Sequence, residues 1–346
     1  MRAAYYEQFK SPIRIETLPD PVASEGEAII RVRATGICRS DWHGWQGHDS
    51  DVQLPHVPGH ELAGTIEAIG SGIQKWKIGD RVTVPFCVGC GNCPQCSKGQ
   101  EQICDNYFQP GFTGWGSFAE FVKIKYADHN LVRLPDSIDY TTAAVLGCRF
   151  ITSWRGVTAQ GNIKPGEWVA VHGCGGVGLS AIMIAAAFGA NPIAIDIDDA
   201  KLKFAESIGA VKTINASKSI NVVDEIKSIT KGGARLSIDA LGSRETCRNS
   251  ILCLKKQGRH VQLGLLAGSE ANPPLPMSAV IANELEIVGS HGMQAHQYPP
   301  MLDMISSGKI QPHKLLGKIV SLEEGVTELM NLNSFKNIGV TVIGFS

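Results

Sequence analysis

The stretch EWVAVHGCGGVG, residues 167–178, joins a short apolar run to a cluster of glycines. Its VAV core is typical of a buried strand, and the alanine-rich stretch up to Phe188 is typical of a helix. Between them, the spacing G-x-G-x-x-G provides a tight turn, a close backbone approach to a pyrophosphate and a close contact between helix and strand. These glycines are Gly173, Gly175 and Gly178, and Gly176 belongs to the same loop. The arrangement predicts a dinucleotide-binding fold.

The next apolar segment indicates which dinucleotide is bound. PIAIDI, residues 192–197, is a second predicted strand, and its Asp196 follows Gly178 by eighteen residues. The dinucleotide fold places an acidic residue roughly 20 residues after its glycines, where it binds the ribose hydroxyls. A carboxylate there also repels a 2′-phosphate, so the sequence favours NAD over NADP. The plainer alternative is that Asp196 caps the helix that follows.

Strand-like and helix-like segments continue to alternate toward residue 289. The further strand-like segments are VKTINA (211–216), RLSIDALG (235–242), RHVQLGL (259–265) and LEIVGS (285–290). The helix-like segments between them are DAKLKFAESIGA (199–210), INVVDEIKSIT (220–230) and SRETCRNSILCLKKQG (243–258). This alternation predicts an α/β domain over 150–289, with a doubly wound parallel sheet of six strands.

The first part of the chain has a different pattern. Short alternating segments separated by Gly and Pro predict an irregular β domain with few helices over 1–149; they are AIIRVRA (28–34), ELAGTIEAIG (61–70), DRVTV (80–84) and AEFVKIK (119–125). After residue 290 the chain has two more helix-like stretches and a last strand, which are PPMLDMISSG (299–308), LEEGVTELMNL (322–332) and GVTVIGF (339–345). We expect this segment, 290–346, to complete the first domain.

Four cysteines lie within fifteen residues in CGNCPQCSKGQEQIC, residues 90–104. Thiolates at this spacing suit a structural zinc ion, which takes four protein ligands and leaves no open position. The sequence therefore predicts a zinc-binding lobe over about 87–105, with chemistry elsewhere. Paired disulfides and an iron–sulfur cluster are the alternatives. The four ligands are Cys90, Cys93, Cys96 and Cys104.

Composition excludes some classes of protein. The 346 residues carry 32 Lys and Arg against 33 Asp and Glu, so no excess of positive charge points to nucleic acid. The most apolar run, residues 179–190, is too short to span a bilayer, and the first residues do not resemble a signal peptide. We therefore expect a cytoplasmic protein without a membrane or nucleic-acid partner. In that reducing setting, ten cysteines point to metal binding or catalysis.

A second set of metal-ligand residues is spread over three distant stretches. These are GICRSDWH (36–43), VPGHELAG (57–64) and LGCRFITS (146–153), which contribute Cys38, His60 and Cys148. Three protein ligands with an open fourth position are typical of a catalytic zinc ion. Spacing alone does not bring the three stretches together.

These motifs resemble the zinc-dependent medium-chain alcohol dehydrogenases over nearly the whole chain. The resemblance implies a GroES-like β domain beside the dinucleotide-binding domain, NAD, and two zinc ions per chain. It implies that Cys38, His60 and Cys148 hold the catalytic zinc, that Glu61 is a transient ligand, and that Asp41 orients the ligand histidine. It also implies cofactor contacts for Arg39 at the pyrophosphate, Thr152 and Val177 at the nicotinamide, and Lys201 at the adenosine ribose.

The implied reaction is reversible hydride transfer between an alcohol and NAD, giving an aldehyde or ketone. Ser40 would accept the hydroxyl proton and His43 would return it to solvent; a turn cap and a solvated loop histidine are their plainer alternatives. The substrate is expected to be a primary or secondary alcohol, and aromatic alcohols are among the candidates. Phe86, Phe118, Trp42, Trp45 and Trp115 are the residues expected to line its pocket.

The last strand departs from the family pattern, and two rival functions stay open. Many relatives carry an arginine in the last strand that reaches the cofactor, and KNIGVTVIGF, residues 336–345, has none. The rival functions are a zinc-free quinone or enoyl reductase of the same fold and a nucleotide-binding protein without turnover.

The apolar segment LEIVGS is expected to pair edge to edge with its copy, and a homotetramer is favoured over a dimer.

Overall fold

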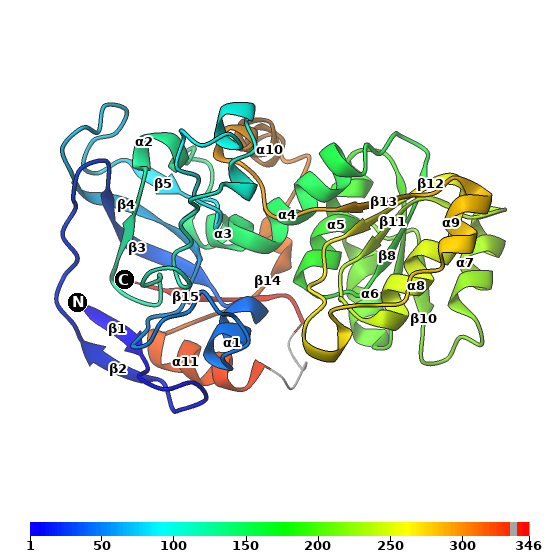
Figure 1. Ribbon diagram of the computed structural model, residues 1–346, viewed down its shortest axis with the longest axis horizontal. Coiled ribbons are helices and arrows are strands. Elements are labelled where there is room, and N and C mark those ends of the chain that lie inside the picture. Colours follow the sequence, from blue (N-terminus) through cyan, green and yellow to red (C-terminus); the bar gives the residue numbers. More distant parts are fainter. Residues whose placement is uncertain (333–337, 346) are drawn as a thin grey trace. The chain divides into compact units, whose positions relative to one another are not determined.

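A computed structural model of the chain describes residues 1–332 and 338–345. The chain divides into two compact units (Figure 1). The first unit comprises Met1–Ile151, Gly292–Gly308 and Pro312–Ser346, and the second comprises Thr152–His291 and Lys309–Gln311. Within the described residues, no helix is long and apolar enough to cross a membrane.

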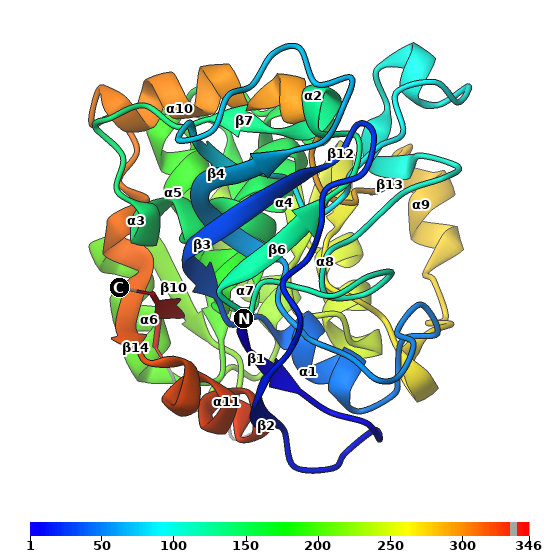
Figure 2. The same cartoon turned by 90° about the vertical axis from the view of Figure 1, so that its left-hand side faces the viewer.

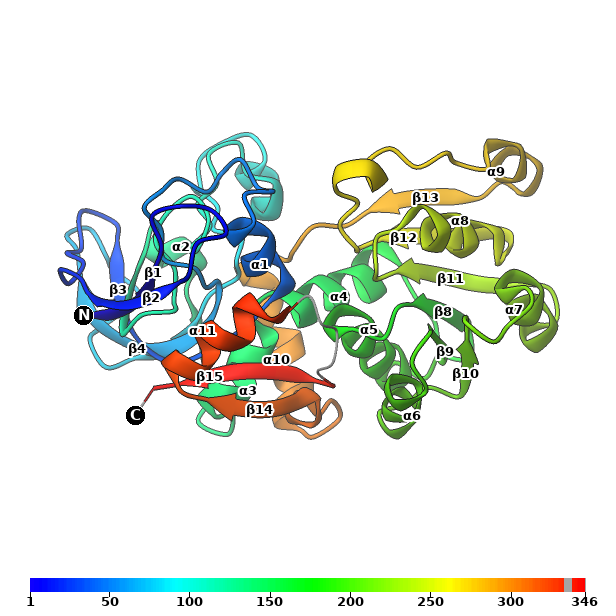
Figure 3. The same cartoon turned by 90° about the horizontal axis from the view of Figure 1, so that it is seen from below.

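A parallel sheet of six strands forms the centre of the second unit, as predicted (Figure 3). Its strands, in spatial order, are β10 (Lys212–Asn215), β9 (Asn191–Asp196), β8 (Trp168–His172), β11 (Ala234–Asp239), β12 (Leu254–Gln262) and β13 (Glu286–Gly289). His172 at the end of β8 is in register with Ile195 and Asp239 of the neighbouring strands. The carboxyl ends of the central strands therefore lie side by side, where a doubly wound fold binds its ligand.

Helices connect these strands, and polar caps set where several of them begin. The helices are α4 (Ile151–Arg155), α5 (Gly176–Ala187), α6 (Asp199–Ser207), α7 (Val222–Thr230), α8 (Arg244–Leu252) and α9 (Met277–Asn283). The side chains of Asp198, Asn221 and Ser243 accept hydrogen bonds from the first turns of α6, α7 and α8. Each cap satisfies backbone N–H groups that have no partner within the helix.

The predicted helix over 243–258 is wrong in its second half. Helix α8 ends at Leu252, and the residues LKKQG that follow open strand β12. Leu254 pairs with Ala234 of β11, and Gln257 has a left-handed backbone with φ of 57°. Leu and Lys favour helices locally, but here the pairing with a buried neighbouring strand overrides that preference.

The first unit is built on a sheet of seven strands (Figure 2). Six of them follow the order β14 (Leu316–Val320), β15 (Val340–Gly344), β3 (Ala28–Gly36), β4 (Glu61–Ile69), β5 (Arg81–Thr83) and β7 (Val132–Arg133). Strand β6 (Phe121–Ile124) pairs with β3, and β1 (Arg2–Tyr5) pairs with β2 (Arg14–Thr17) in a separate hairpin. Because β15 pairs antiparallel with β3, the end of the chain extends the sheet that residue 28 begins.

Short helices surround this sheet, and the sequence pattern missed the first of them. They are α1 (Arg39–Trp45), α2 (Ala127–Asn130), α3 (Tyr140–Val145), α10 (Tyr298–Ser306) and α11 (Leu322–Met330), with a π-helical turn at Leu146–Phe150. Ile37, Trp45, Val326 and Ile343 share one buried cluster. This core joins α1 to α11 and β15, so the segment that carries Cys38 is fixed by packing on the C-terminal elements.

Candidate active site and metal centres

The structure brings Cys38, His60, Glu61 and Cys148 together. One ligand atom from each lies within 4.8 Å of all the others. Gly36 of β3 is in register with Glu61 of β4, so the residues just beyond the ends of these two strands are neighbours. Cys148 comes from the π-helical turn that follows α3. Three segments that are far apart in the sequence therefore meet at one edge of the sheet.

Asp41 orients this cluster through a buried carboxylate. Its Oδ1 lies 2.8 Å from Nδ1 of His60 and accepts a hydrogen bond of 3.0 Å from the backbone N–H of Gly59. Its Oδ2 accepts a hydrogen bond of 3.0 Å from the backbone N–H of Cys38. The carboxylate accepts a hydrogen bond from the Nδ1–H of His60, so the neutral imidazole presents its lone pair at Nε2. The resemblance implied this role for Asp41, and the contacts support it.

The donors in this cluster fit a zinc ion. Nε2 of His60 is buried and has no hydrogen-bond partner among the residues that the structure describes, a state that native proteins seldom leave unexplained. The hydrogen bond from Cys148 lowers the pKa of the Cys38 thiol well below its usual range. Two sulfur ligands and one imidazole nitrogen match the donor set of catalytic zinc sites with an open fourth position.

Arg149 is the residue of this site that the motifs did not indicate. Its guanidinium forms an ion pair with the fully buried Glu61, in which Nε donates to Oε1 at 3.0 Å and Nη2 contacts Oε2. The backbone N–H of Arg149 donates to the same Oε1 at 3.3 Å. Burial raises the pKa of Glu61 to about 7 in spite of this partner. A Cβ at Gly36 would overlap the Glu61 carboxylate, so only glycine leaves the pair its space.

Ser40 and His43, the predicted proton-transfer residues, both lie on α1. The hydroxyl of Ser40 is 3.8 Å from the sulfur of Cys38. His43 is half-buried, and its Nδ1 lies 3.0 Å from Nδ1 of His48, a histidine that the sequence analysis did not single out. Burial lowers the pKa of His43, and the charges of Arg39 and His48 lower it further. Helix α1 therefore places a hydroxyl group beside Cys38 and an imidazole further along the same helix.

Aromatic rings flank His60, but only one of them was expected to line the pocket. The rings of Phe86 and Phe112 lie edge-on to the imidazole at 6.1 and 5.3 Å. By contrast, Phe118 and Trp45 belong to the buried core of the first unit, and the Trp45 indole donates to the carbonyl of Ser11. These two were wrong as pocket residues because an aromatic side chain near a motif is as readily a core residue.

Two further tryptophans take different positions. Trp115 is exposed and packs its ring edge-on against Tyr5 at 6.2 Å, and its indole donates to the carbonyl of Pro55. Trp42 lies on α1, where the Arg39 guanidinium is 5.2 Å from its ring centre. Trp42 therefore lies on the same helix as Ser40 and His43, whereas Trp115 is fixed in the region of β1.

In the second unit, the glycine loop has the features expected of a phosphate-binding turn. Gly173 has φ of 96°, and a Cβ at Gly178 would overlap the carbonyl oxygen of Gly173. A Cβ at Gly175 would meet nothing within 4 Å, so the backbone at this position faces open space. The first glycine thus makes the turn, the third permits close packing, and the second leaves room for a ligand.

Asp196 lies directly beside this loop. Its Oδ2 accepts a hydrogen bond of 2.7 Å from the backbone N–H of Cys174, and its Oδ1 accepts one of 2.8 Å from Ile197. The helix that follows is capped by Asp198, whose Oδ1 accepts from Ala200. The alternative that Asp196 caps α6 is therefore wrong, because its neighbour two residues on does so.

Three other residues are predicted to contact the cofactor. Thr152 and Lys201 lie in the second unit, and Arg39 lies in the first unit. Thr152 is buried on α4, and the next residue, Ser153, donates its hydroxyl to the carbonyl of Val177 at 2.7 Å. Lys201 lies in the first turn of α6, where its backbone N–H approaches Asp198. Arg39 lies on α1 of the first unit. Their contacts with a cofactor stay predictions.

The four cysteines of the lobe form the second cluster. Their sulfur atoms all lie within 4.8 Å of one another. The backbone N–H groups of Cys90 and Asn106 approach the sulfur of Cys104 at 3.2 and 3.3 Å, and that of Cys96 approaches Cys93 at 3.4 Å. All ten cysteines of the chain are free, so the disulfide alternative is not realised. Four thiols with supporting N–H groups fit a closed zinc site.

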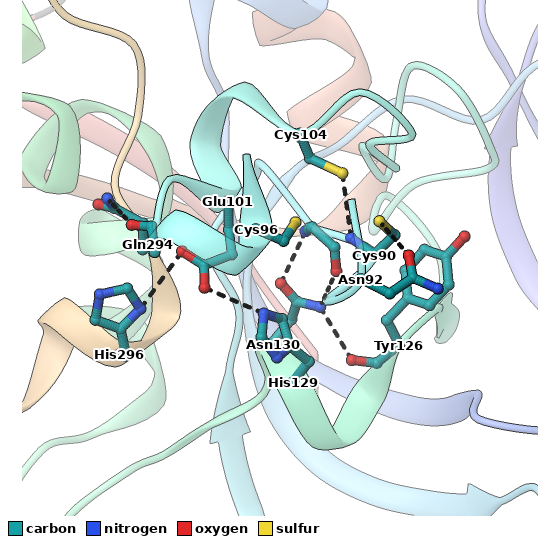
Figure 4. A network of polar contacts seen from close by, with 12 residues as sticks. Cys90, Asn92, Cys96, Glu101, Cys104, Tyr126, His129, Asn130, Gln294 and His296 are labelled. Carbon is teal, nitrogen blue, oxygen red and sulfur yellow. Dashed lines mark hydrogen bonds and ion pairs between the residues drawn. The ribbon is translucent and has the colours of Figure 1, made fainter. Parts of the chain in front are cut away.

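Polar contacts anchor this lobe to the rest of the first unit (Figure 4). The side chain of Asn130 on α2 bonds both the N–H and the carbonyl of Gly89, at 2.9 and 2.8 Å. The buried Glu101 lies between two histidines, with Oε1 3.2 Å from His129 and Oε2 3.4 Å from His296. The lobe is thus held by α2 on one side and by the segment before α10 on the other.

Comparison with known proteins identifies the class and the family. The family described as alcohol dehydrogenase GroES-like domain matches residues 24–136, and the family described as zinc-binding dehydrogenase matches residues 176–307. An alcohol dehydrogenase of Geobacillus stearothermophilus is 33% identical over 90% of each chain. An NAD-dependent alcohol dehydrogenase of Sulfurisphaera tokodaii is 33% identical over 99% of each chain. The solved structure of the alcohol dehydrogenase from Thermus sp. ATN1 superposes with a TM-score of 0.91 at 30% identity, over 99% of each chain.

A GroES-like unit followed by a parallel dinucleotide-binding sheet defines the medium-chain dehydrogenase class. Within that class, the chain belongs to the zinc-type alcohol dehydrogenase family.

Proposed function

We propose that this chain is an NAD-dependent alcohol dehydrogenase that interconverts a primary or secondary alcohol with its aldehyde or ketone. The observation that carries the proposal is the cluster of Cys38, His60 and Cys148, in which the buried Nε2 of His60 has no hydrogen-bond partner among the described residues. The names of the relatives in Geobacillus and Sulfurisphaera agree with this activity.

Two zinc ions are assigned to the two clusters. Cys38, His60 and Cys148 hold the catalytic ion, with Glu61 as a transient ligand, and Asp41 orients the imidazole. When bound, this zinc supplies a Lewis acid that makes a nearby hydroxyl more acidic. The lobe cysteines hold the second ion, which contributes to folding rather than to turnover. Glu61 keeps both of its oxygens on Arg149 in the structure, which fits an occasional ligand rather than a permanent one.

The chain's own residues bind the substrate and move its proton. Phe86 and Phe112 beside His60 offer apolar surface to the carbon chain or ring of an alcohol. Ser40 accepts the hydroxyl proton, and His43, three residues further along α1, returns it to solvent. A bound nicotinamide cofactor would supply the acceptor for the substrate's hydride, and the protein would orient that chemistry without supplying it.

NAD is the proposed cofactor of the second unit. Gly173, Gly175, Gly176 and Gly178 form its pyrophosphate turn, and Asp196 lies beside that turn with a carboxylate suited to ribose hydroxyls. Val177 and Thr152 are assigned to the nicotinamide, Lys201 to the adenosine ribose and Arg39 to the pyrophosphate. The same carboxylate disfavours a 2′-phosphate, which supports NAD over NADP.

The rival functions explain less of the site. A zinc-free quinone or enoyl reductase has no use for two thiols gathered around a buried histidine. A nucleotide-binding protein without turnover has no use for Ser40 beside Cys38 or for His43 of α1 beside His48. Both rivals predict a protein that oxidises no alcohol.

We further assign the chain to the cytoplasm and to a homo-oligomer, a tetramer in preference to a dimer. Strand β13 is the last strand of its sheet, and its Ile287 is exposed. A strand edge with apolar side chains invites pairing with a second copy. Light scattering tests the assembly, and a monomer at micromolar concentration would contradict it.

The activity test is a panel of primary, secondary and aromatic alcohols with NAD, followed by NADH absorbance. We expect turnover of at least one medium-sized or aromatic alcohol and loss of that turnover after removal of zinc with a chelator. Reduction of quinones by the metal-free protein, without alcohol oxidation, would favour the reductase instead.

A further inference from the structure

His48 is held against His43 by the end of helix α1. The helix ends at Trp45, Gly47 turns the chain with φ of 72°, and the backbone N–H of His48 donates to the carbonyl of His43 at 3.0 Å. The two imidazole rings then lie with their centroids 5.4 Å apart. The local turn that ends α1 therefore brings the two histidines together, and contacts with residues distant in the sequence are not needed for this.

The contact between the rings is a hydrogen bond between two nitrogens. Nδ1 of His43 lies 3.0 Å from Nδ1 of His48, and in such a pair one ring donates while the other accepts. His43 is half-buried, whereas His48 is exposed. Trp42 contacts both rings edge-on, at 5.1 and 5.8 Å, and so limits their freedom to separate.

We propose that His48 is the residue through which the active-site proton leaves the protein. A proton reaches His43 at Nε2, a proton leaves Nδ1 of His43 for Nδ1 of His48, and His48 gives one from Nε2 to water or buffer. One proton enters the pair and one leaves it, with no oxidation or reduction. Exchange with water then restores the starting tautomers. The inference rests on the proposed dehydrogenase function and on the assignment of His43 to proton transfer.

The surroundings of His43 favour passing the proton on rather than keeping it. Burial lowers the pKa of His43, and Arg39 and His48 lower it further, whereas the charges of Cys38 and Asp49 act in the opposite sense. The ring of His48 is exposed, so it can pass a proton directly to water or buffer. A half-buried base with an exposed base beside it therefore forms an outward path.

The variant His48→Gln tests this role. We expect the transient rate of alcohol-dependent NADH formation at pH 7 in dilute buffer to fall about 3- to 10-fold, less than the roughly 10²- to 10⁴-fold contribution of a general acid or base, because water partly replaces an exposed group. Imidazole at constant ionic strength should restore the rate, because a soluble base can replace a solvent-exposed one. A purely structural role for His48 would not respond to imidazole. His313→Gln, which changes another exposed histidine of the same unit, is the matched control.

A double-mutant cycle with His43→Gln tests whether the two histidines act in one proton path or independently of each other. If the two histidines act in series, adding His48→Gln to His43→Gln should cost nothing further. Additive losses, or a His48→Gln protein with the wild-type rate at every pH and buffer concentration, would overturn the relay while leaving the dehydrogenase function intact. A wild-type protein that oxidises no alcohol would overturn the proposed function and the relay with it.

Discussion

Asp41 shows how much of the site depends on one side chain. Its two oxygens contact Cys38, Gly59 and His60, and the carboxylate is 1% exposed. The same residue ends the capping box at the start of α1, so it fixes both the histidine and the helix that carries Ser40. Sequence resemblance assigned its partner, but only the structure shows the contacts to the backbone of Cys38 and Gly59.

Replacing Asp196 tests the choice of cofactor at the level of one residue. Asp196→Ser removes a charged acceptor for the ribose hydroxyls, so we expect the ratio of kcat/KM for NAD to that for NADP to fall about 10- to 100-fold, as lost hydrogen bonds to a charged group predict. Asp196→Asn removes the charge with little change of side-chain shape, and its one amide oxygen can accept from the N–H of either Cys174 or Ile197, so it is the matched control for shape. Equal kcat/KM values with NAD and NADP in the unchanged protein would contradict the assignment.

The ion pair of Arg149 and Glu61 gives a second prediction at this scale. Arg149→Met leaves the fully buried carboxylate of Glu61 without its partner, which typically costs about 3–5 kcal/mol of unfolding free energy. Arg149→Met combined with Glu61→Gln should recover part of that loss, because no charge is then left unpaired. Urea unfolding of the zinc-loaded proteins measures both effects. A single Arg149→Met variant as stable as the wild type would show that the pair does not hold the carboxylate.

At the level of elements, local signals predicted the second unit well and the first unit less well. The strand, glycine loop and Asp196 lie close together in the sequence, so their pattern was enough to find β8, α5 and β9. Helix α1 was missed because CRSDWHGW has no apolar repeat, and its start depends on a capping box between Cys38 and Asp41. Arg149 adjoins a predicted ligand, but its partner Glu61 is 88 residues away, and such contacts leave no local pattern.

The cysteine lobe is an element whose stability should depend on metal. Within residues 90–104 the structure has only two short 3₁₀ turns, Cys96–Lys98 and Glu101–Ile103, and the backbone hydrogen bonds inside this stretch are all local. Cys93→Ser should therefore lower the thermal midpoint and the yield of protein, since structural zinc contributes folding free energy. Cys247→Ser, which changes a buried thiol outside both clusters, is the control. A Cys93→Ser protein with an unchanged midpoint and one zinc fewer would show that the lobe folds without its ion.

The buried histidine at the end of β8 predicts a pH dependence for the parallel sheet. Burial, with a smaller effect of His260, lowers the pKa of His172 to about 3. The unfolded chain binds a proton at this histidine below about pH 6.5 while the folded chain does not. Stability should therefore hold above that pH and decrease as the pH falls toward 3, by up to about 1.4 kcal/mol per pH unit for this group. His172→Gln should reduce the slope of unfolding free energy between pH 6.5 and 4.5, and an identical slope would contradict this account.

At the level of the whole molecule, the chain has two clusters of zinc-binding residues, and we expect the two zinc ions to have different roles. The lobe cluster is closed by four sulfurs, whereas the cluster of Cys38, His60 and Cys148 has three strong donors and a carboxylate already paired with Arg149. Loss of the first ion should affect the fold, and loss of the second should affect the reaction. We therefore infer that the two ions have separate roles within the first unit.

The most direct measurement of that claim is zinc per chain, determined together with alcohol oxidation, in the wild type, Cys38→Ser and Cys93→Ser. We predict two zinc ions and turnover for the wild type. Cys38→Ser should retain the lobe zinc and a near-native thermal midpoint but lose turnover by more than about 10³-fold, because transition-state stabilisation by the metal is lost. Active wild-type protein with one zinc or none, or a Cys38→Ser protein that still oxidises alcohol at the wild-type rate, would contradict the account.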